Sequence, residues 1–525
     1  MTEPPRRRTV PPSAVAALVA LAAGLAVASR EMGGLGGDDA EYVLLAKSLG
    51  GFEGYSSGWA PGPRVPHALY PPLFPLLLAP FAGSAPGSFL PCHLLVALLG
   101  AGATGLVALL FERRGLPPWA AAAGALVPAL SFFWLASAAD VLSELPFLFF
   151  VASALLLLEP GDADRLPTRR VGLAAAAAGL AFGTRTSGLA LVLVVAAALV
   201  LDRRTRGRAA WIAAGCLLAA CAAWFLYARA CGTGGGYIAQ LAGGEGGLAG
   251  APGRAFRTLA GTYLPKSPRF VFPHPGEGWL LAGLALWGLV LVATVEGFLR
   301  RRALAVPEAF LVVYLAMQSA WPFDDPRFAL PFAILLVPLA LETVQRIAAR
   351  LASPPTTGRI SVAAALLLLL PNGSLVLGQV LPRALRERPE GVPGDHEPAR
   401  FAQTWTWSDD QYRQAAPSLA AFLHACDLVR EGVPGARGLP GGPVLASNPR
   451  AAALLCGRTS VQPPAGAPPD AVAALVREKG VALVLVDNFA GGYSEALCGY
   501  ASARAADLEP LVVLPGQVSI LGVRR

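Results

Sequence analysis

Apolar runs close to the length of a membrane span constrain this chain more than any other feature. A helix needs roughly 20 consecutive apolar residues to cross a bilayer, and such runs recur from the amino terminus to about residue 380. Only 14% of the 525 residues are charged, against roughly 25% in soluble proteins. The chain has too little polar surface for a soluble globule, and the pattern predicts a polytopic α-helical membrane protein.

We expect about eleven transmembrane helices. Two short apolar runs lie within 171–201, and the polar residues Thr184 to Gly188 between them predict a tight hairpin. The other nine runs lie at about 13–30, 88–110, 117–136, 144–158, 209–230, 278–299, 305–321, 328–347 and 360–380.

Arginine clusters set the expected orientation, because short cytoplasmic loops are enriched in Lys and Arg. With eleven spans and a cytoplasmic amino terminus, every cluster falls on the cytoplasmic side. The clusters lie at 6–8, 113–114, 165–170, 203–208, 300–302 and 346–359. The net charge of +8 is therefore mainly a topology signal. Separate short loops do not form the continuous basic face that nucleic-acid binding requires, so nucleic acid is not an expected partner.

The composition changes at about residue 381 to Pro, Gly, charge and short apolar runs. Helical spacing over 415–430 and 470–479, with strand patterns at 443–447 and 481–486, predicts a small α/β unit. The change of composition marks the start of a soluble domain.

The expected domains are a membrane module over 1–380 and an extracytoplasmic α/β domain over 381–525. Within the module, two long segments on the outer side interrupt the apolar pattern, at 31–87 and 231–277. The seven cysteines have no metal-ligand spacing. One disulfide among Cys426, Cys456 and Cys498 is compatible with an oxidising outer compartment, and the pairing is left open.

Under this topology, charged residues outside the arginine clusters meet at the outer membrane surface. A charge drawn into hydrocarbon costs about 3 kcal/mol, so those flanking apolar runs need a partner or a polar cavity. Arg327 has a simpler explanation, an interfacial ion pair with Asp324 worth under about 1 kcal/mol. The candidate residues are Asp38, Asp39, Glu144, Arg185, Lys266, Arg269 and Arg327.

The acidic pair Asp38-Asp39 is the strongest candidate for chemistry. A carboxylate at a membrane surface can act as a general base on a hydroxyl or amine that attacks an electrophile. Successive side chains diverge, so the second carboxylate is expected to hold a cation rather than share the first one's task. Nearby cations such as Arg185, Lys266 and Arg269 suit a departing phosphate.

Several motifs together resemble the bacterial members of the glycosyltransferase C superfamily, which includes protein O-mannosyltransferases and lipid A aminoarabinose transferases. They are the acidic segment 37–49, the turn Tyr70-Pro71-Pro72-Leu73, Ser143-Glu144-Leu145-Pro146, the hairpin tip 183–188, and Pro326-Arg327-Phe328-Ala329-Leu330-Pro331. A soluble outer carboxyl-terminal domain is also common in that family.

The resemblance implies transfer of a sugar from a polyprenyl-phosphate carrier to a lipid, glycan or protein acceptor, on the outer face of a bacterial cytoplasmic membrane. Asp38 matches the proposed general base, and Asp39 matches its helper. Some members need a divalent cation, but we predict no metal and no other cofactor. The residues expected to bind substrate are Tyr70, Glu144, Arg185, Lys266, Arg269 and Arg327.

Two other classes of function were weighed. A transporter or flippase of a lipid-linked sugar would need charges near the membrane midplane and inverted repeats, and the sequence shows surface charges and no evident repeat. A membrane scaffold would leave Asp38, Asp39 and Glu144 unexplained. The transferase is therefore the leading hypothesis, and the identities of its sugar and acceptor are left open.

Overall fold

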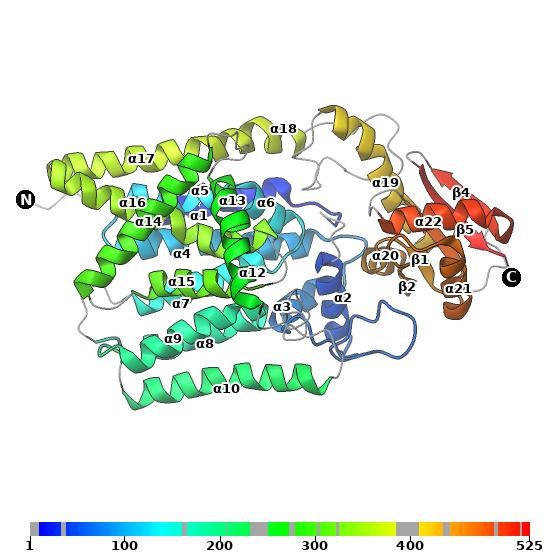
Figure 1. Ribbon diagram of the computed structural model, residues 1–525, viewed down its shortest axis with the longest axis horizontal. Coiled ribbons are helices and arrows are strands. Elements are labelled where there is room, and N and C mark those ends of the chain that lie inside the picture. The colour runs from blue at the N-terminus through cyan, green and yellow to red at the C-terminus, as the bar shows by residue number, and fades with distance from the viewer. Residues whose placement is uncertain are drawn as a thin grey trace, which may run out of the picture.

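The computed structural model describes residues 10–32, 38–159, 165–205, 207–231, 250–271, 279–301, 305–321, 325–384, 409–433, 441–487, 492–514 and 517–524. A bundle of long helices occupies one end of the molecule, and a small sheet with its helices occupies the other (Figure 1). The helix α2 lies between the two parts.

The helix α4 (Leu90–Arg113) is central to the bundle and packs against α1, α5 and α7. Further helices are α2 (Asp38–Gly50), α3 (Leu73–Ala82), α12 (Ala251–Thr258), α13 (Leu264–Lys266) and α18 (Leu381–Ala384). The other bundle helices are α1 (Pro12–Val27), α5 (Pro118–Ala129), α6 (Phe132–Ala139), α7 (Glu144–Leu158), α8 (Thr168–Thr184), α9 (Leu189–Leu201), α10 (Arg208–Ala230), α14 (Trp279–Arg301), α15 (Val306–Ser319), α16 (Leu330–Leu351) and α17 (Pro354–Leu375).

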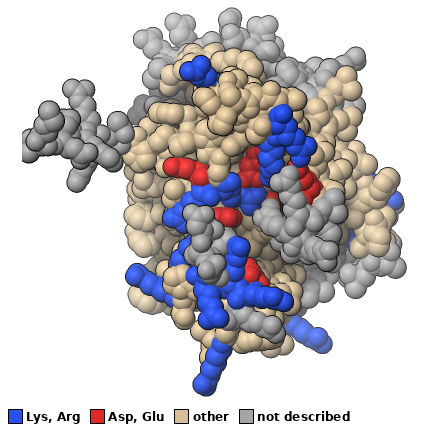
Figure 2. All heavy atoms as spheres, turned by 90° about the vertical axis from the view of Figure 1, so that its left-hand side faces the viewer, with Lys and Arg blue, Asp and Glu red and all other residues tan. Residues whose placement is uncertain are grey.

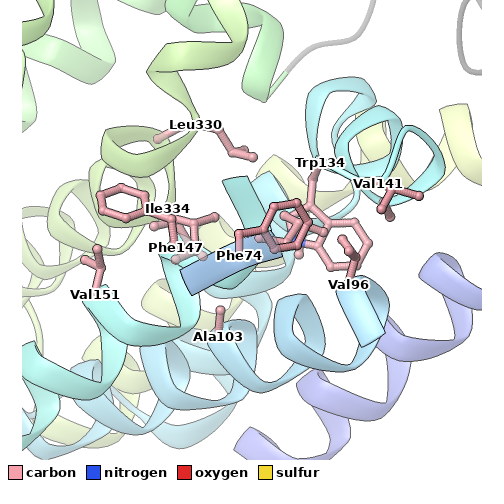
Figure 3. Close-up of a cluster of buried hydrophobic side chains, with 14 of the residues drawn as sticks. Phe74, Val96, Ala103, Trp134, Val141, Phe147, Val151, Leu330 and Ile334 are labelled. Atoms are coloured by element: carbon pink, nitrogen blue, oxygen red, sulfur yellow. The ribbon is translucent and has the colours of Figure 1, made fainter. Parts of the chain in front are cut away.

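The bundle core combines large side chains with very small ones. Phe74, Trp134 and Phe147 are fully buried, and Figure 3 shows them beside aliphatic side chains of α4 and α16. A Cβ added at Gly100 would lie 2.7 Å from the Trp134 ring, and one at Gly24 would lie 2.9 Å from the Ala97 Cβ. Small residues of this kind let helix backbones approach closely, which is how helices associate in a membrane.

Four helices of the described chain are long and apolar enough to cross a membrane, namely Leu90–Arg113, Arg208–Ala230, Arg327–Leu351 and Pro354–Val380. A fifth is obtained when α5 and α6 are taken as one bent span. Other apolar helices, among them α1, α7 and α15, are shorter than 18 residues. The structure agrees with a helical membrane protein, while the number of eleven spans stays a prediction.

One expected span, 117–136, is not a continuous helix. The helix α5 ends at Ala129, directly after Pro128, and α6 runs on to Ala139 at an angle of 62°. Proline ends or kinks a helix because it lacks an N–H and its ring clashes with the preceding turn. Ser131 then caps α6 by accepting the Trp134 N–H (3.4 Å).

Arginines gather at the end of the bundle away from the sheet, which Figure 2 shows as basic side chains around a smaller acidic group. Arg114, which follows α4, is buried and pairs with Glu159 (3.6 Å), Glu308 (2.7 Å) and Glu342 (2.6 Å). These carboxylates lie directly after α7, in the first turn of α15 and just past the middle of α16. The side of the membrane that this end faces stays a prediction.

The carboxyl-terminal sheet has five strands in the order β2-β1-β3-β5-β4. Strands β1 and β3 pair in parallel, with Val444 opposite Leu483, and β2 also runs parallel to β1. Strand β5 is antiparallel to both β3 and β4. The strands are β1 (Val444–Ala446), β2 (Ser460–Val461), β3 (Leu483–Val486), β4 (Leu508–Leu514) and β5 (Val518–Val523), with the helices α19 (Asp409–Glu431), α20 (Pro449–Cys456), α21 (Pro469–Lys479) and α22 (Gly492–Ala503).

A small carboxyl-terminal α/β region was expected, and the structure has one. The predicted helices correspond to α19 and α21, and the predicted strands to β1 and β3. Strand β2, the antiparallel pair β4 and β5, and the helices α20 and α22 were not foreseen. The exact boundary between the two domains stays a proposal.

Candidate functional site

The acidic residues of the first outer segment form the first turn of α2. Asp38, Asp39 and Glu41 all lie in that turn, where negative charge interacts favourably with the amino-terminal end of the helix dipole. Asp38 and Glu41 are three positions apart, a spacing that places two helical residues on the same face. The helix therefore presents two carboxylates together and directs Asp39 elsewhere.

Asp38 is held by donors from three other parts of the chain. The Tyr70 hydroxyl donates to Oδ1 (2.7 Å), and Nη2 of Arg327 donates to Oδ2 (2.6 Å). The guanidinium of Arg450 lies 3.9 Å from Oδ1. Burial alone would raise the pKa of the Asp38 carboxyl, but Arg327, the Tyr70 hydrogen bond and Arg450 outweigh it and hold that pKa below its usual value. Asp38 is therefore ionised at neutral pH.

A buried ion pair lies beside Asp38. Glu144, the first residue of α7, has a side chain that is 1% exposed, and Nη1 of Arg185 lies 2.7 Å from its Oε1. Arg185 also donates to Oγ of Ser143 (3.0 Å), which in turn hydrogen-bonds with the Tyr42 hydroxyl (2.9 Å). Arg185 is thus the charged partner that Glu144 needs beside the apolar runs. Ser143 and Tyr42 connect this ion pair to α2.

Arg185 reaches this position because the predicted hairpin is present. The helix α8 ends at Thr184, Arg185 is extended, and the short turn η1 (Thr186–Gly188) leads into α9. A Cβ on Gly188 would come within 2.6 Å of the Phe182 backbone. Only glycine fits at this close approach, so the tip of the hairpin depends on it.

Arg327 contacts both Asp38 and Glu144. It lies in η4 (Pro326–Ala329), just before α16, and its Nε contacts Asp325 (2.9 Å) and lies 3.9 Å from Glu144. The ring of Phe328 lies under two guanidinium groups, 5.5 Å from Arg185 and 5.2 Å from Arg327, a favourable cation–π arrangement. The ion pair expected for Arg327 was with Asp324, which lies outside the described residues. Arg327 pairs with Asp325 and also contacts the rest of the site.

Three residues of the site were not among the expected binding residues. Glu41, with a side chain 2% exposed, pairs with His67 Nδ1 (3.3 Å) and with Arg450 Nε (3.0 Å). His67 Nε2 accepts the Tyr70 backbone N–H (3.0 Å), so a neutral His67 carries its proton on Nδ1, facing Glu41. Helical spacing from Asp38 could have indicated Glu41, but no local signal points to Arg450, which comes from α20.

Asp140 is a further acidic group at this end, between α6 and α7. One of its carboxylate oxygens is buried and has no hydrogen-bond partner in the described part of the chain. Burial raises the pKa of Asp140 to about 7, with Arg327 opposing and Glu144 reinforcing the shift. Asp140 therefore exchanges its proton near neutral pH, unlike Asp38.

The remaining expected residues have different outcomes. Asp39 is buried, and its Oδ1 accepts the Ala40 N–H (2.9 Å). Arg269 is exposed in η3 (Ser267–Phe270), and no hydrogen bond or ion pair connects it to another residue that the structure describes. The side chain of Lys266 and all of Asp324 lie outside the described residues.

Among the described side chains, no group of three or more His, Cys, Asp or Glu is arranged to hold a metal ion. The carboxylates of the site instead contact guanidinium groups: Asp38 and Glu144 contact Arg327, and Glu41 contacts Arg450.

Comparison with known proteins gives a result at the level of structure. No protein-family model matches this sequence, and no curated protein sequence matches it. Crystal structures of ArnT from Cupriavidus metallidurans do match, over 97% of both chains. The TM-score is 0.55 at 15% identity for the apo state and 0.53 at 13% identity for the complex with undecaprenyl phosphate.

The oligosaccharyltransferase of Archaeoglobus fulgidus, in a complex with zinc and sulfate, matches with a TM-score of 0.52 and 14% identity, over 90% of this chain and 67% of that chain. The chain has a glycosyltransferase C fold. The resemblance inferred from the motifs is confirmed at this level. At such low identity, the likeness of the glycosyltransferase C fold concerns the path of the backbone, and what the site does is argued from its own residues.

Proposed function

We propose that the protein is an integral membrane glycosyltransferase that moves one sugar from a polyprenyl-phosphate carrier to a lipid, glycan or protein acceptor. The reaction would occur on the outer face of a bacterial cytoplasmic membrane, with the amino terminus in the cytoplasm and the α/β domain outside. A lipid-linked donor suits that side, because nucleotide sugars stay in the cytoplasm. ArnT, whose structure was solved with undecaprenyl phosphate, shares the fold.

The observation that carries the proposal is that Arg327 contacts both Asp38 and Glu144, and that Glu144 in turn pairs with Arg185. Such an assembly offers both a proton acceptor and cations. A general base and a stabilised leaving group are the two requirements for displacing a phosphate from a sugar.

In the proposed reaction, Asp38 accepts the proton of the acceptor hydroxyl or amine as that atom attacks the anomeric carbon. A bond forms from the acceptor atom to this carbon, and the bond from the carbon to the phosphate oxygen breaks. The carrier phosphate leaves with the electron pair, and the configuration inverts. Arg327 and Arg185 would stabilise the negative charge that develops on the phosphate.

The other residues receive supporting roles. Tyr70 orients the Asp38 carboxylate through its hydroxyl, and Glu144 keeps Arg185 in place. Asp39 remains the proposed helper beside Asp38. Lys266 and Arg269 are proposed to approach the carrier phosphate when it binds.

The test uses purified full-length protein in lipid nanodiscs with radiolabelled prenyl-phosphate sugars and a membrane extract as the source of acceptor. Label should move to a lipid, glycan or protein fraction with wild type and not with Asp38→Asn. A flippase, the alternative function, would instead move labelled donor across sealed vesicles without converting it. Transbilayer movement with no transfer to any acceptor would refute the proposal.

A further inference from the structure

The carboxyl-terminal domain reaches the membrane site through one side chain. Arg450 lies in the first turn of α20, directly after β1, and α20 packs against α2. Its Nε lies 3.0 Å from Oε2 of Glu41, and its Nη1 lies 3.9 Å from Oδ1 of Asp38. Different nitrogens of one guanidinium therefore contact two carboxylates of α2.

We infer that Arg450 is a positioning residue, which holds Asp38 and Glu41 in one geometry and couples the docking of the carboxyl-terminal domain to the readiness of Asp38 as a base. The inference rests on the proposed function. It extends that function by making the soluble domain part of the site rather than a cover over it.

The surroundings of Glu41 require a cation at this place. The Glu41 side chain is almost fully buried. Among the described residues, its ion-pair contacts are with Arg450 and with His67. Removing one partner of a buried ion pair is strongly destabilising, because it leaves a charge uncompensated. Without Arg450, the first turn of α2 would have to shift to relieve the uncompensated charge.

Arg450 also affects Asp38 directly. The groups that face the Asp38 carboxylate are Tyr70 from the first outer segment, Arg327 from η4 and Arg450 from α20, with Glu41 on its own helix. Glu144 and Asp325 lie beyond Arg327. Arg450 is one of the groups that lower the pKa of Asp38, so its loss should raise that pKa.

The geometry also predicts that lysine cannot replace this arginine fully. A lysine ammonium is a compact point charge, whereas the planar guanidinium presents several N–H groups in a fixed fork. Arg450→Lys could contact Glu41 or Asp38, but not both in the present arrangement.

The experiment compares Arg450→Gln, Arg450→Lys and the matched control Arg477→Gln, an exposed arginine of α21, in the full-length protein. Sugar transfer is measured as a function of pH, because the profile of kcat/KM reports the ionisation of the free enzyme. Arg450→Gln should lower kcat/KM at least tenfold and move its acid limb to higher pH. Arg450→Lys should be intermediate, and Arg477→Gln should match wild type.

A second measurement does not depend on activity. Hydrogen exchange of the α2 amides should be faster in Arg450→Gln than in wild type and unchanged in Arg477→Gln. The inference would be overturned if Arg450→Gln left both the acid limb of the kcat/KM profile and the hydrogen exchange of the α2 amides unchanged. Absence of transfer in wild type, with faster α2 exchange in Arg450→Gln, would refute the proposed function and leave the contact standing.

An independent observation concerns Cys426 and Cys456. The Cys426 side chain lies within hydrogen-bonding reach of Cys456, and both are buried in the core that joins α19 to α20. Arg430, one turn after Cys426, donates to the carbonyl of Leu455 (3.3 Å), which fixes this face of α19 against the end of α20. Both are free thiols in the structure.

We propose that Cys426 and Cys456 form a disulfide in the mature protein. The two thiols lose two protons and two electrons, one S–S bond forms, and a protein or small-molecule disulfide outside the membrane is reduced to two thiols. This bond would fasten α20, which carries Arg450, to α19. Cys498 is exposed and would remain a thiol.

The test is alkylation of full-length protein, purified from oxidising conditions and unfolded in dodecyl sulfate, with a maleimide that increases the mass. Wild type should gain two additional adducts after reduction, and Cys426→Ser should gain none because Cys456 is then already free. Cys498→Ser, the control, should still gain two. Full alkylation of wild type before reduction would overturn the proposal.

Discussion

Arg327 donates a 2.6 Å hydrogen bond to Oδ2 of Asp38, although 289 positions separate the two residues in the chain. One comes from the turn before α16 and the other from the first turn of α2. The contact exists only once the bundle has formed, so the proposed base acquires this cationic partner from the completed fold.

Asp38→Asn should reduce sugar transfer by about 10²- to 10⁴-fold, the usual contribution of a general base. The amide keeps the shape of the side chain but loses the charge that pairs with Arg327, so the thermal unfolding midpoint should also fall modestly. Transfer of labelled sugar is the measurement, and Glu53→Gln, an exposed carboxylate of the same outer segment, is the control. Wild-type activity in Asp38→Asn would remove Asp38 as the base.

Arg185→Met should lower the thermal stability of the full-length protein in detergent. Among the described residues, the change leaves the buried Glu144 with the distant Nε of Arg327, at 3.9 Å, as its remaining cation. Breaking a buried ion pair costs about 3–5 kcal/mol. The double variant Glu144→Gln with Arg185→Met should recover part of the loss, because the uncompensated charge is gone. If the double variant is as unstable as Arg185→Met, charge is not the cause.

Tyr70→Phe should shift the pH dependence of transfer while leaving the fold intact. The Tyr70 hydrogen bond is one of the interactions that lower the pKa of Asp38, so its removal raises this pKa, and the acid limb of kcat/KM should move to higher pH. The aromatic contacts of the Tyr70 ring with Tyr42 and His67 remain. Tyr227→Phe, on the exposed side of α10, should leave the profile unchanged.

Asp140 should make the protein less stable as the pH rises. Its pKa is about 7 in the folded state and 3.8 in an unperturbed carboxyl, so between these values the folded state binds a proton that the unfolded state has lost. Stability therefore falls from about pH 4 to pH 7 and levels off above it. Thermal unfolding of Asp140→Asn should lack this slope, and the exposed control Asp202→Asn should keep it.

Gly188→Ala should disturb the hairpin that presents Arg185. The new Cβ would meet the backbone of Phe182 at 2.6 Å, which rotation of a side chain cannot relieve. Gly172→Ala, in α8 with open space around its Cβ, should be neutral or stabilising, because alanine favours a helix by roughly 1 kcal/mol over glycine. Unfolding midpoints and transfer rates of both variants measure the difference.

The sequence was informative wherever the signal is local. The apolar runs predicted most bundle helices, the polar tip at 184–188 predicted the α8–α9 hairpin, and the scarcity of charge next to apolar runs led to Glu144 and Arg185. Each of these arguments needs only neighbouring residues and the cost of placing a charge in hydrocarbon.

Contacts between distant segments could not be predicted in this way. Arg450 has no motif around it, and only the docking of α20 on α2 brings it to Glu41. The break between α5 and α6, by contrast, follows local signals, Pro128 and the cap at Ser131, which the expected span 117–136 did not take into account. The fold class and several members of the site followed from patterns along the chain, whereas the contacts among those members and the presence of Arg450 followed from tertiary structure.

The edge of the sheet at β2 has a consequence for handling this protein. The Ser460 N–H donates to the carbonyl of Trp59 (2.8 Å), so the first outer segment covers part of a strand edge that would otherwise offer its backbone groups to other molecules. Uncovered strand edges recruit strands from other chains. A fragment expressed without the membrane helices would expose this edge and should aggregate, so studies of the sheet domain are best made on the intact chain.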